Sequence, residues 1–412
     1  MFDYNKNTFD KKLRIAFVID VYPTISTFII NQITGLIDLG HEVYIYPSGK
    51  KDITEGEIER NYNLKNHVYY PSNFIGNRKN KYSVFFKTIL KNLYFTPKQT
   101  IYTLNPFIHG KRAFQLHLYF KYLYLLGKQI DIIQAHYGMF GNKALELKKI
   151  GWSAPIFTMF HGFDIRTALK EGSHIYNELF AKGDYFQAIS KFNYNHLVNF
   201  GAPKNKIISH TVGIELDKFI YKPRLQKDND PLIIMSTGRL VWEKGYEFAL
   251  EAMRILEMTG LDFEYRIIGD GNLKDELLDL TKNLKLNERV KFLGLKNQED
   301  IITELESAHI FLMASVAEVL PLVLMESLAS GIPTISTDVG STSEIIIDKK
   351  TGLLIPSKNP SAIAEAITWL VSNEEDWKEY ANSGRAHVEK YFDINKLNVK
   401  LEKSYLEAVR KQ

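Results

Sequence analysis

The sequence predicts an α/β protein built from two Rossmann-like, doubly wound domains that face each other across a cleft. Short apolar runs of strand type alternate with helical segments along most of the 412 residues. That alternation is typical of a parallel sheet covered by helices. The polar, charged segment 218–230 interrupts it once. The length also suits two or three domains, because a domain typically spans ~100–200 residues.

The first alternating series precedes the charged segment. Residues 12–20 (KLRIAFVID) are typical of a buried strand, and 27–39 of a helix that is closed by Gly40. Further strands are expected at 42–47, 131–136, 154–161, 184–190 and 206–212, with helices around 82–93 and 111–126.

The second series follows the charged segment and ends in long amphipathic helices at 373–391 and 395–410. Its strands are expected near Leu232, Phe263, Val290, Ile310, Thr334 and Gly352. We therefore predict a first domain over 1–217, a linker over 218–230, a second domain over 231–390 and a C-terminal helix over 391–412.

The composition excludes several kinds of chemistry. The chain has no cysteine, so it forms no disulfide, thiolate nucleophile or cysteine-ligated metal site, and this suits a reducing cytoplasm. No apolar run approaches the ~18 residues of a membrane span, and residues 1–12 are too polar for a signal peptide. We expect a protein that is neither integral to a membrane nor secreted by that route.

The positive charge is concentrated between Glu59 and Asp131, where twelve basic residues and no acidic residue occur among many aromatic residues. Such a segment, residues 60–130, could meet anionic lipid head groups or a phosphorylated substrate. No nucleic-acid motif accompanies it, so we expect no nucleic-acid partner. Alternatively, the aromatic residues form the buried faces of two helices and the lysines form their solvated sides.

The segment 315–333 (SVAEVLPLVLMESLASGIP) places two carboxylates, Glu318 and Glu326, on either side of a loop-to-helix junction. Residues 322–330 predict a helix that ends at Gly331. The loop follows a strand, and open α/β sheets bind ligands at the carboxyl ends of their strands. Taken alone, the two acids could equally complement the helix dipole and face solvent.

Another βα junction, residues 236–253 (STGRLVWEKGYEFALEAM), carries the cations Arg239 and Lys244 after a turn at Gly238. A helix N-terminus and two cations can hold a diphosphate and stabilise a departing phosphate oxygen. The next junction has Gly269 and Gly271, which permit close approach of a ligand. The third glycine of the dinucleotide fingerprint is missing, so we predict no NAD site.

In the first domain, candidate residues follow two strands. FHGFDIR supplies His161 and Asp164, and QAHYGMFG supplies His136. A histidine at such a position is more often packed or bonded to backbone than catalytic, and the spacing of the histidines is not that of a metal site. We therefore predict no metal.

Together these motifs resemble the family-4 retaining glycosyltransferases. The motifs are GRLVWEKG, GDG, the pair Glu318 and Glu326, GLLIP, and in the first domain YPTISTFIINQI, AHYGMFG, FHGFDIR and HTVGIELDKF. The set is most similar to the branch that builds bacterial exopolysaccharide and colanic-acid-type repeat units. The resemblance covers nearly the whole chain and implies the type-B architecture, with the final helix crossing back to the first domain.

The resemblance also implies roles for individual residues. Arg239 and Lys244 would bind the donor diphosphate, and Glu326 the ribose of the nucleotide. Glu318 would address the donor sugar, and His161 would reach that sugar from the other domain. The remaining donor-binding candidates are Gly238, Gly269, Leu320, Pro321, Leu322 and Val323. His136, Asp164 and Ser26 are the candidates on the acceptor or sugar side.

The implied reaction transfers a hexosyl unit from a nucleotide diphosphate sugar to an acceptor, with retention of configuration and without a metal or other cofactor. The implied acceptor is a polyprenyl-diphosphate-linked glycan at the cytoplasmic face of the membrane. Front-face attack is favoured over a covalent intermediate, and the alternatives are a sugar-nucleotide epimerase, a phosphorylase or a non-catalytic scaffold. The sequence departs from the family where Val319 replaces the usual glycine, where Glu215 replaces aspartate, and where Ser26 is followed directly by Thr27.

Overall fold

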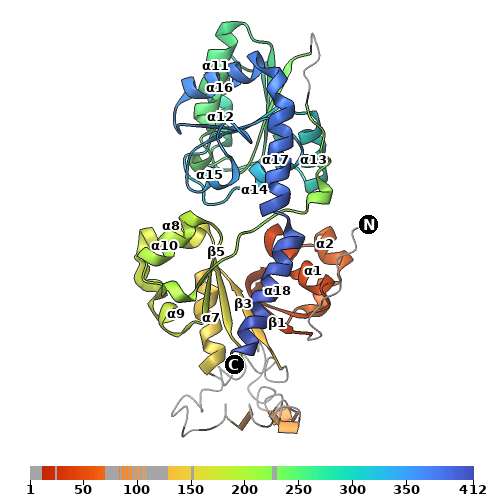
Figure 1. Cartoon of the computed structure of the whole chain (residues 1–412), viewed down its shortest axis with the longest axis vertical. Helices are drawn as coiled ribbons and strands as arrows, with labels where there is room; N and C mark the ends of the chain where they lie inside the picture. Colours follow the sequence, from red (N-terminus) through yellow and green to blue (C-terminus); the bar gives the residue numbers. More distant parts are fainter. Residues whose placement is uncertain are drawn as a thin grey trace. The chain divides into compact units, whose positions relative to one another are not determined.

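The computed structural model in Figure 1 describes residues 12–23, 26–69, 129–149, 153–224 and 230–412, with single residues and short groups between 83 and 107. The described residues form two compact units. One comprises 1–188, 196–210 and 398–412, and the other comprises 189–195 and 211–397. The described residues of the expected helix around 82–93 are helical, whereas the expected helix around 111–126, and most of segment 60–130, lie outside the described residues.

The first unit is built on a parallel sheet of six strands in the order β2-β1-β3-β4-β5-β6. The strands are β1 (Arg14–Tyr22), β2 (Glu42–Lys50), β3 (Ile132–His136), β4 (Ile156–Phe160), β5 (Tyr185–Ala188) and β6 (Ile207–Ser209). Ile15 on β1 pairs with Val43 on β2 and with Ile132 on β3. All three side chains are buried, as expected for a parallel sheet covered on both faces.

Helices of the first unit connect and cover these strands. They are α1 (Thr27–Asp38), α2 (Glu57–Asn61), α7 (Gly138–Lys149), α8 (Gly162–Glu171), α9 (Asn177–Lys182) and α10 (Lys191–Asn199). From residue 398 onward, the last helix α18 (Ile394–Arg410) also belongs to this unit. Its Leu401, Tyr405 and Leu406 pack into the core formed by β1, β2 and α1.

The second unit repeats the architecture with the strand order β12-β11-β10-β7-β8-β9, again all parallel. The strands are β7 (Leu232–Thr237), β8 (Phe263–Ile268), β9 (Val290–Gly294), β10 (Ile310–Met313), β11 (Thr334–Thr337) and β12 (Leu353–Ile355). The helices are α11 (Tyr246–Thr259), α12 (Lys274–Asn283), α13 (Gln298–Ser307), α14 (Leu322–Ala329), α15 (Thr342–Ile345), α16 (Pro360–Ser372) and α17 (Trp377–Tyr391).

Two separate hydrophobic clusters cover the faces of this second sheet. Leu232 and Ile234 contribute to the cluster beneath α11 and α16, whereas Met235 contributes to the cluster beneath α14. Successive strand residues point to opposite faces, so β7 supplies both clusters. Helices on both sides of a parallel sheet make each unit doubly wound, which confirms the predicted fold class.

The segment that precedes β7 is anchored to the second unit rather than fully solvated. Phe219 is buried in the cluster beneath α14. Arg224 is also buried, and its guanidinium donates to the carbonyl oxygens of Ala308 and Leu305, both at 2.9 Å. Residues 219–224 therefore hold the start of the second unit in place.

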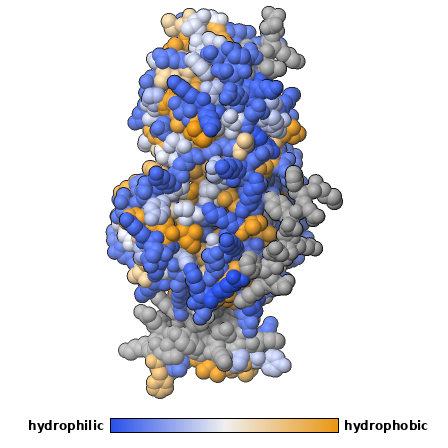
Figure 2. All heavy atoms as spheres, viewed as in Figure 1, coloured by the Kyte–Doolittle hydropathy of each residue, from blue (hydrophilic) through white to orange (hydrophobic). Residues whose placement is uncertain are grey.

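Elsewhere the surface is mostly hydrophilic on the face drawn in Figure 2. Among the described residues, no helix is both long enough and apolar enough to cross a bilayer.

Candidate active site

The loops after β7 and β8 touch through backbone atoms. Gly238 and Gly269 have φ angles of +156° and +145°, which side-chain-bearing residues rarely adopt. A Cβ atom on Gly269 would lie 1.9 Å from the carbonyl oxygen of Gly238. Glycine is therefore required at Gly269, and the two loops form one continuous backbone surface at the carboxyl edge of the sheet.

A short turn then leads from Gly238 into α11. Gly245 precedes the helix with a φ of +62°, and a Cβ atom there would lie 2.2 Å from the carbonyl oxygen of Ala314. Tyr246, the first residue of α11, donates from its hydroxyl to the Gly238 carbonyl oxygen at 3.2 Å. These contacts fix the turn that carries Arg239 and Lys244. Arg239 is exposed, whereas the side chain of Lys244 is only 19% exposed.

Lys244 and Glu318 form an ion pair across two loops. The Lys244 Nζ lies 2.5 Å from Glu318 Oε1, and the Ser315 hydroxyl donates to the same oxygen at 2.9 Å. The backbone amide of Val316 donates to the Glu243 carbonyl oxygen at 2.8 Å, which joins the loops beside the pair. The structure thus brings together the first predicted carboxylate and one of the two predicted cations.

Glu326 lies on α14, one helical segment beyond Glu318. The helix ends as expected: the amide of Gly331 bonds to the Leu328 carbonyl at 3.1 Å, and that of Ile332 bonds to the Ser327 carbonyl at 3.1 Å. The side chain of Glu326 is partly exposed, yet no described donor bonds to its carboxylate. Burial of the carboxyl group raises the pKa of Glu326 to about 7.

The other donor-side candidates form the loop and first turn between these acids. Pro321 precedes the first residue of α14 and is buried, while Leu320, Leu322 and Val323 are partly exposed. Val319 is 9% exposed and forms part of the protein interior. Immediately behind it, a Cβ atom on Gly340 would lie 1.9 Å from the Glu318 carbonyl oxygen, so close backbone packing holds this loop too.

This edge of the second sheet concentrates charge. Two cations, two carboxylates and a glycine-lined backbone surface lie on loops and helix starts that follow β7, β8 and β10. Such a set can bind a phosphorylated ligand and accept hydrogen bonds from hydroxyl groups. Among the described residues, no group of three or more His, Asp or Glu side chains could hold a metal ion.

The histidines at the carboxyl edge of the first sheet are buried and uncharged at neutral pH. His136 Nδ1 lies 3.2 Å from His161 Nε2, and His136 Nε2 lies 2.7 Å from the amide oxygen of Gln32. Burial lowers the pKa of His161 to about 3 and places that of His136 well below its usual value. Because a neutral imidazole has one donor and the amide oxygen of Gln32 only accepts, His136 donates from Nε2 and His161 donates to His136 Nδ1.

Asp164 organises the backbone around these histidines. One carboxylate oxygen accepts from the His161 amide at 2.8 Å, and the other accepts from the Gly138 amide at 2.8 Å and the Tyr176 hydroxyl at 3.0 Å. Burial raises the pKa of Asp164 to about 6 despite these bonds. The carboxylate thus bonds to the first turns of α7 and α8, where the helix dipoles favour negative charge.

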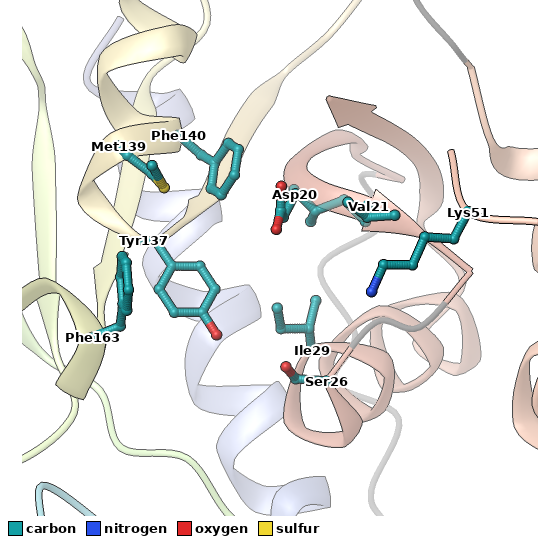
Figure 3. Close-up of a pocket in the computed structure, with 10 residues that line it drawn as sticks. Asp20, Val21, Ser26, Ile29, Lys51, Tyr137, Met139, Phe140 and Phe163 are labelled. Atoms are coloured by element: carbon teal, nitrogen blue, oxygen red, sulfur yellow. The ribbon is translucent and has the colours of Figure 1, made fainter. Parts of the chain in front are cut away.

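Ser26 lies in front of this buried group and lines a cavity of about 440 Å³ (Figure 3). The other lining residues are Ile19, Asp20, Val21, Ile29, Lys51, Tyr137, Met139, Phe140 and Phe163. The Tyr137 ring centroid is 4.7 Å from that of His161, so an aromatic ring lies next to the buried histidine.

Sequence reasoning named Ser26 and missed the other nine lining residues. Tyr137 directly follows His136, and Phe163 lies two residues after His161 in FHGFDIR, so an aromatic residue close to a candidate histidine was a usable signal. Lys51 gave no signal, because one lysine after a strand is ordinary.

Comparisons with known proteins agree with this architecture. Residues 217–387 match the family described as Glycosyl transferases group 1. The chain is 32% identical to the amylovoran biosynthesis glycosyltransferase AmsK of Erwinia amylovora, with 92% of this chain and 96% of that protein covered. It is 30% identical to the putative colanic acid biosynthesis glycosyltransferase WcaL of Escherichia coli, with 86% and 90% covered.

Solved structures share the fold at lower sequence identity. A glycosyltransferase from Rickettsia africae superposes with a TM-score of 0.69 at 19% identity, covering 97% of this chain and all of the other. HepE of Anabaena, solved in complex with UDP-glucose, gives a TM-score of 0.68 at 14% identity, covering 96% and 100%. The fold is the type-B glycosyltransferase architecture, and the identity to AmsK over nearly the whole of both proteins shows that this chain belongs to the group 1 glycosyltransferases.

Proposed function

We propose that this protein is a retaining glycosyltransferase of bacterial surface polysaccharide biosynthesis. It moves a hexosyl unit from a nucleotide diphosphate sugar to a glycan acceptor. The single observation that carries the proposal is the charged carboxyl edge of the second sheet, where Lys244 lies beside Gly238 and pairs with Glu318, and Glu326 follows on α14. AmsK is named for amylovoran biosynthesis and WcaL as a putative colanic acid biosynthesis glycosyltransferase, and these names support the choice of pathway class.

The donor binds at this edge through complementary charge. Arg239 and Lys244 contact the diphosphate, and the glycines at 238 and 269 let backbone amides approach it. Glu326 accepts hydrogen bonds from the ribose hydroxyls. Glu318, with the backbone amides of residues 320–323, binds the donor sugar. HepE, a structure of the same fold, holds UDP-glucose, which supports a nucleotide sugar as the donor class.

Transfer proceeds by front-face attack. The bond between the sugar C1 and the leaving phosphate oxygen breaks, and a bond from C1 to the acceptor hydroxyl oxygen forms on the same face. The acceptor's proton passes to the leaving phosphate oxygen, so no paired acid and base is needed. Lys244 and Arg239 stabilise the negative charge on the departing diphosphate, which is the task a metal performs elsewhere.

On the acceptor side, we propose a polyprenyl-diphosphate-linked glycan at the cytoplasmic membrane face. A Campylobacter jejuni relative that is 30% identical over 63% of this chain is named for transfer to a diphospho-undecaprenol-linked sugar. The acid-free segment 60–130 supplies the positive charge that would attract an anionic membrane. Liposome co-sedimentation at low salt should favour anionic over neutral vesicles, and equal binding would exclude membrane attraction.

The reaction itself is tested by incubating the full chain with nucleotide sugars and a short lipid-linked glycan in the presence of EDTA. We expect a new glycosidic bond with the anomeric configuration of the donor, which the proton coupling at C1 reports. An altered sugar without acceptor would indicate an epimerase. Nucleotide-sugar binding without any turnover, over the full panel of acceptors, would favour a scaffold.

A further inference from the structure

We infer that the cavity of the first unit is the acceptor subsite and that it selects an acceptor carrying an anionic group. Lys51 contacts the anionic group, and Tyr137 and Phe163 hold a sugar ring of the acceptor. The role as acceptor subsite rests on the proposed function. The preference for an anion rests on the cavity alone.

The cavity has the size and composition of a ligand site. Its volume of about 440 Å³ lies within the ~300–1,000 Å³ of small-molecule pockets, which are mostly apolar with a few convergent polar groups. Apolar side chains from β1, α1 and α7 line most of it (Figure 3). Its polar groups are Asp20, Ser26, Lys51 and the Tyr137 hydroxyl.

One wall presents two aromatic rings. Tyr137 and Phe163 meet edge to face, with centroids 6.2 Å apart and planes at 88°. Phe163 is 50% exposed although it is large and apolar. Rings arranged in this way offer an exposed apolar face against which the C–H face of a sugar can lie, while the ring edges leave its hydroxyls free to bond elsewhere.

The backbone of Tyr137 adopts a rarely occupied conformation, which positions its ring in the aromatic wall of the cavity. Its φ is +72°, in the left-handed region that a bulky residue rarely occupies. The Tyr137 amide donates to the Met159 carbonyl oxygen at 2.8 Å, and its hydroxyl bonds to Ser26. Strain of this kind persists where the surroundings enforce it and concentrates at binding sites. Here it places the ring between the buried His161 and the cavity.

The opposite side of the cavity carries the positive charge. Lys51 extends toward the aromatic wall from the end of β2 (Figure 3). Among the described residues, no carboxylate forms an ion pair with Lys51, and Asp20 is the acidic residue that lines the same cavity. Asp20, on β1, can accept hydrogen bonds from sugar hydroxyls. This arrangement therefore fits a ligand whose sugar ring lies against Tyr137 and whose anionic group lies against Lys51.

Two sources of that anion share the same chemistry. It can be a carboxylate on the acceptor sugar or the phosphate through which the glycan is attached to its carrier. Three probes separate them: benzyl β-glucuronide, neutral benzyl β-glucoside, and a glucosyl benzyl diphosphate. Their dissociation constants for the full chain are measured by calorimetry at low salt, without nucleotide.

We expect at least one anionic probe to bind about tenfold more tightly than the neutral glucoside, because charge-assisted hydrogen bonds are the stronger class. Lys51→Met should abolish that preference, and Lys51→Arg should retain it. Lys50→Met is the matched control: it removes an exposed lysine one residue away that does not line the cavity. Phe163→Ala should weaken all three probes. Whichever anionic probe is preferred identifies the source of the anion.

Equal binding of the three probes, no binding of any, or a preference that survives Lys51→Met would overturn the inference. The proposed function fails differently. If nucleotide diphosphates do not stabilise the chain through Lys244, the donor assignment is wrong even when Lys51-dependent binding of the probes is observed.

Discussion

The carboxyl edges of the two parallel sheets differ in the charged groups that they present to a ligand. In the second unit, the edge carries Lys244 paired with Glu318, the exposed Arg239, and Glu326 with no described hydrogen-bond donor. In the first unit, the histidines that follow β3 and β4 are buried and neutral, and they bond to each other. The second unit thus presents its paired charges at the edge itself, whereas the polar groups around the histidines of the first unit bond to one another and to the backbone.

This difference assigns separate tasks to the two units. Charge that remains available to a ligand suits the binding of a diphosphate and the stabilisation of its departure. Buried, neutral histidines beside an aromatic cavity with one lysine suit the binding of a sugar ring that carries an anionic group. The predictions below test whether the two edges behave independently, beginning with the largest expected effect.

Removing residues 398–412 should unfold the first unit and leave the second folded. The deletion takes the fully buried Leu401 and Tyr405 out of the first core, together with the bond from the Tyr405 hydroxyl to Gln134 at 2.6 Å. Each large buried side chain lost costs about 2–5 kcal/mol, so the two together remove about 4–10 kcal/mol, which is comparable with the roughly 5–15 kcal/mol that keeps a typical domain folded. Calorimetry of the truncated chain should show the unfolding transition of the second unit and no transition for the first unit. Two intact transitions would show that α18 is dispensable.

Lys244→Ala should lower kcat by about 10²–10³ without altering the fold, because it removes a cation from the leaving group and leaves Glu318 unpaired. The measurement is steady-state transfer alongside circular dichroism. Lys282→Ala, at an exposed position on α12, is the control and should retain full activity. Turnover at the normal rate in Lys244→Ala would remove this residue from the donor site.

Gly269→Ala should destabilise the second unit by roughly 2–4 kcal/mol and abolish nucleotide binding, because a methyl group there collides with the Gly238 carbonyl oxygen. Gly260→Ala is a sharp comparison. Gly260 also has a positive φ, of +80°, but nothing lies within 4 Å of its missing Cβ. It should cost only about 1 kcal/mol and bind nucleotide normally. If both variants lose similar amounts of stability and nucleotide affinity, the positive φ angle of each glycine, and not the contact between the two loops, would be the cause.

Glu326→Gln should stabilise the second unit at neutral and higher pH. The folded pKa of Glu326, about 7, lies above its ordinary value of 4.5, so wild-type folding loses stability as pH rises between these values. At roughly 1.4 kcal/mol per pKa unit, the variant should gain about 3 kcal/mol above pH 7 and nothing below pH 4.5. Nucleotide binding should weaken in the same variant. Denaturant titrations of the wild type and the variant at pH 4.5 and 8 measure this difference in the free energy of unfolding.

The first unit should respond to pH in the opposite direction. The folded pKa of His161 is depressed to about 3, so the unfolded state binds a proton first, and stability is lost as pH falls below 6.5. Between pH 7 and 5 the loss should be about 2 kcal/mol for this residue. His161→Asn should flatten that dependence. The transfer rate itself should show no histidine titration between pH 6 and 8.

The repeating parts of this structure were predictable from the sequence. The order of strands and helices and the end of α14 at Gly331 follow from local patterns. The cavity was not predictable, because Asp20, Lys51 and Tyr137 are brought together only by the β2-β1-β3 strand order, which periodicity does not specify. Likewise, the sequence placed His136 and His161 after strands, but only packing shows that they bond to each other and stay neutral.

The central claim is that the charged edge of the second unit binds a nucleotide diphosphate. It is tested most directly by a thermal-shift panel of UDP, GDP, ADP and their sugar conjugates with wild type and Lys244→Ala, without added metal. One nucleotide series should stabilise the wild type by about 2.7 kcal/mol at 100 times its dissociation constant, and the effect should vanish in the variant. A flat panel with folded protein, or a shift that Lys244→Ala retains, would contradict the claim.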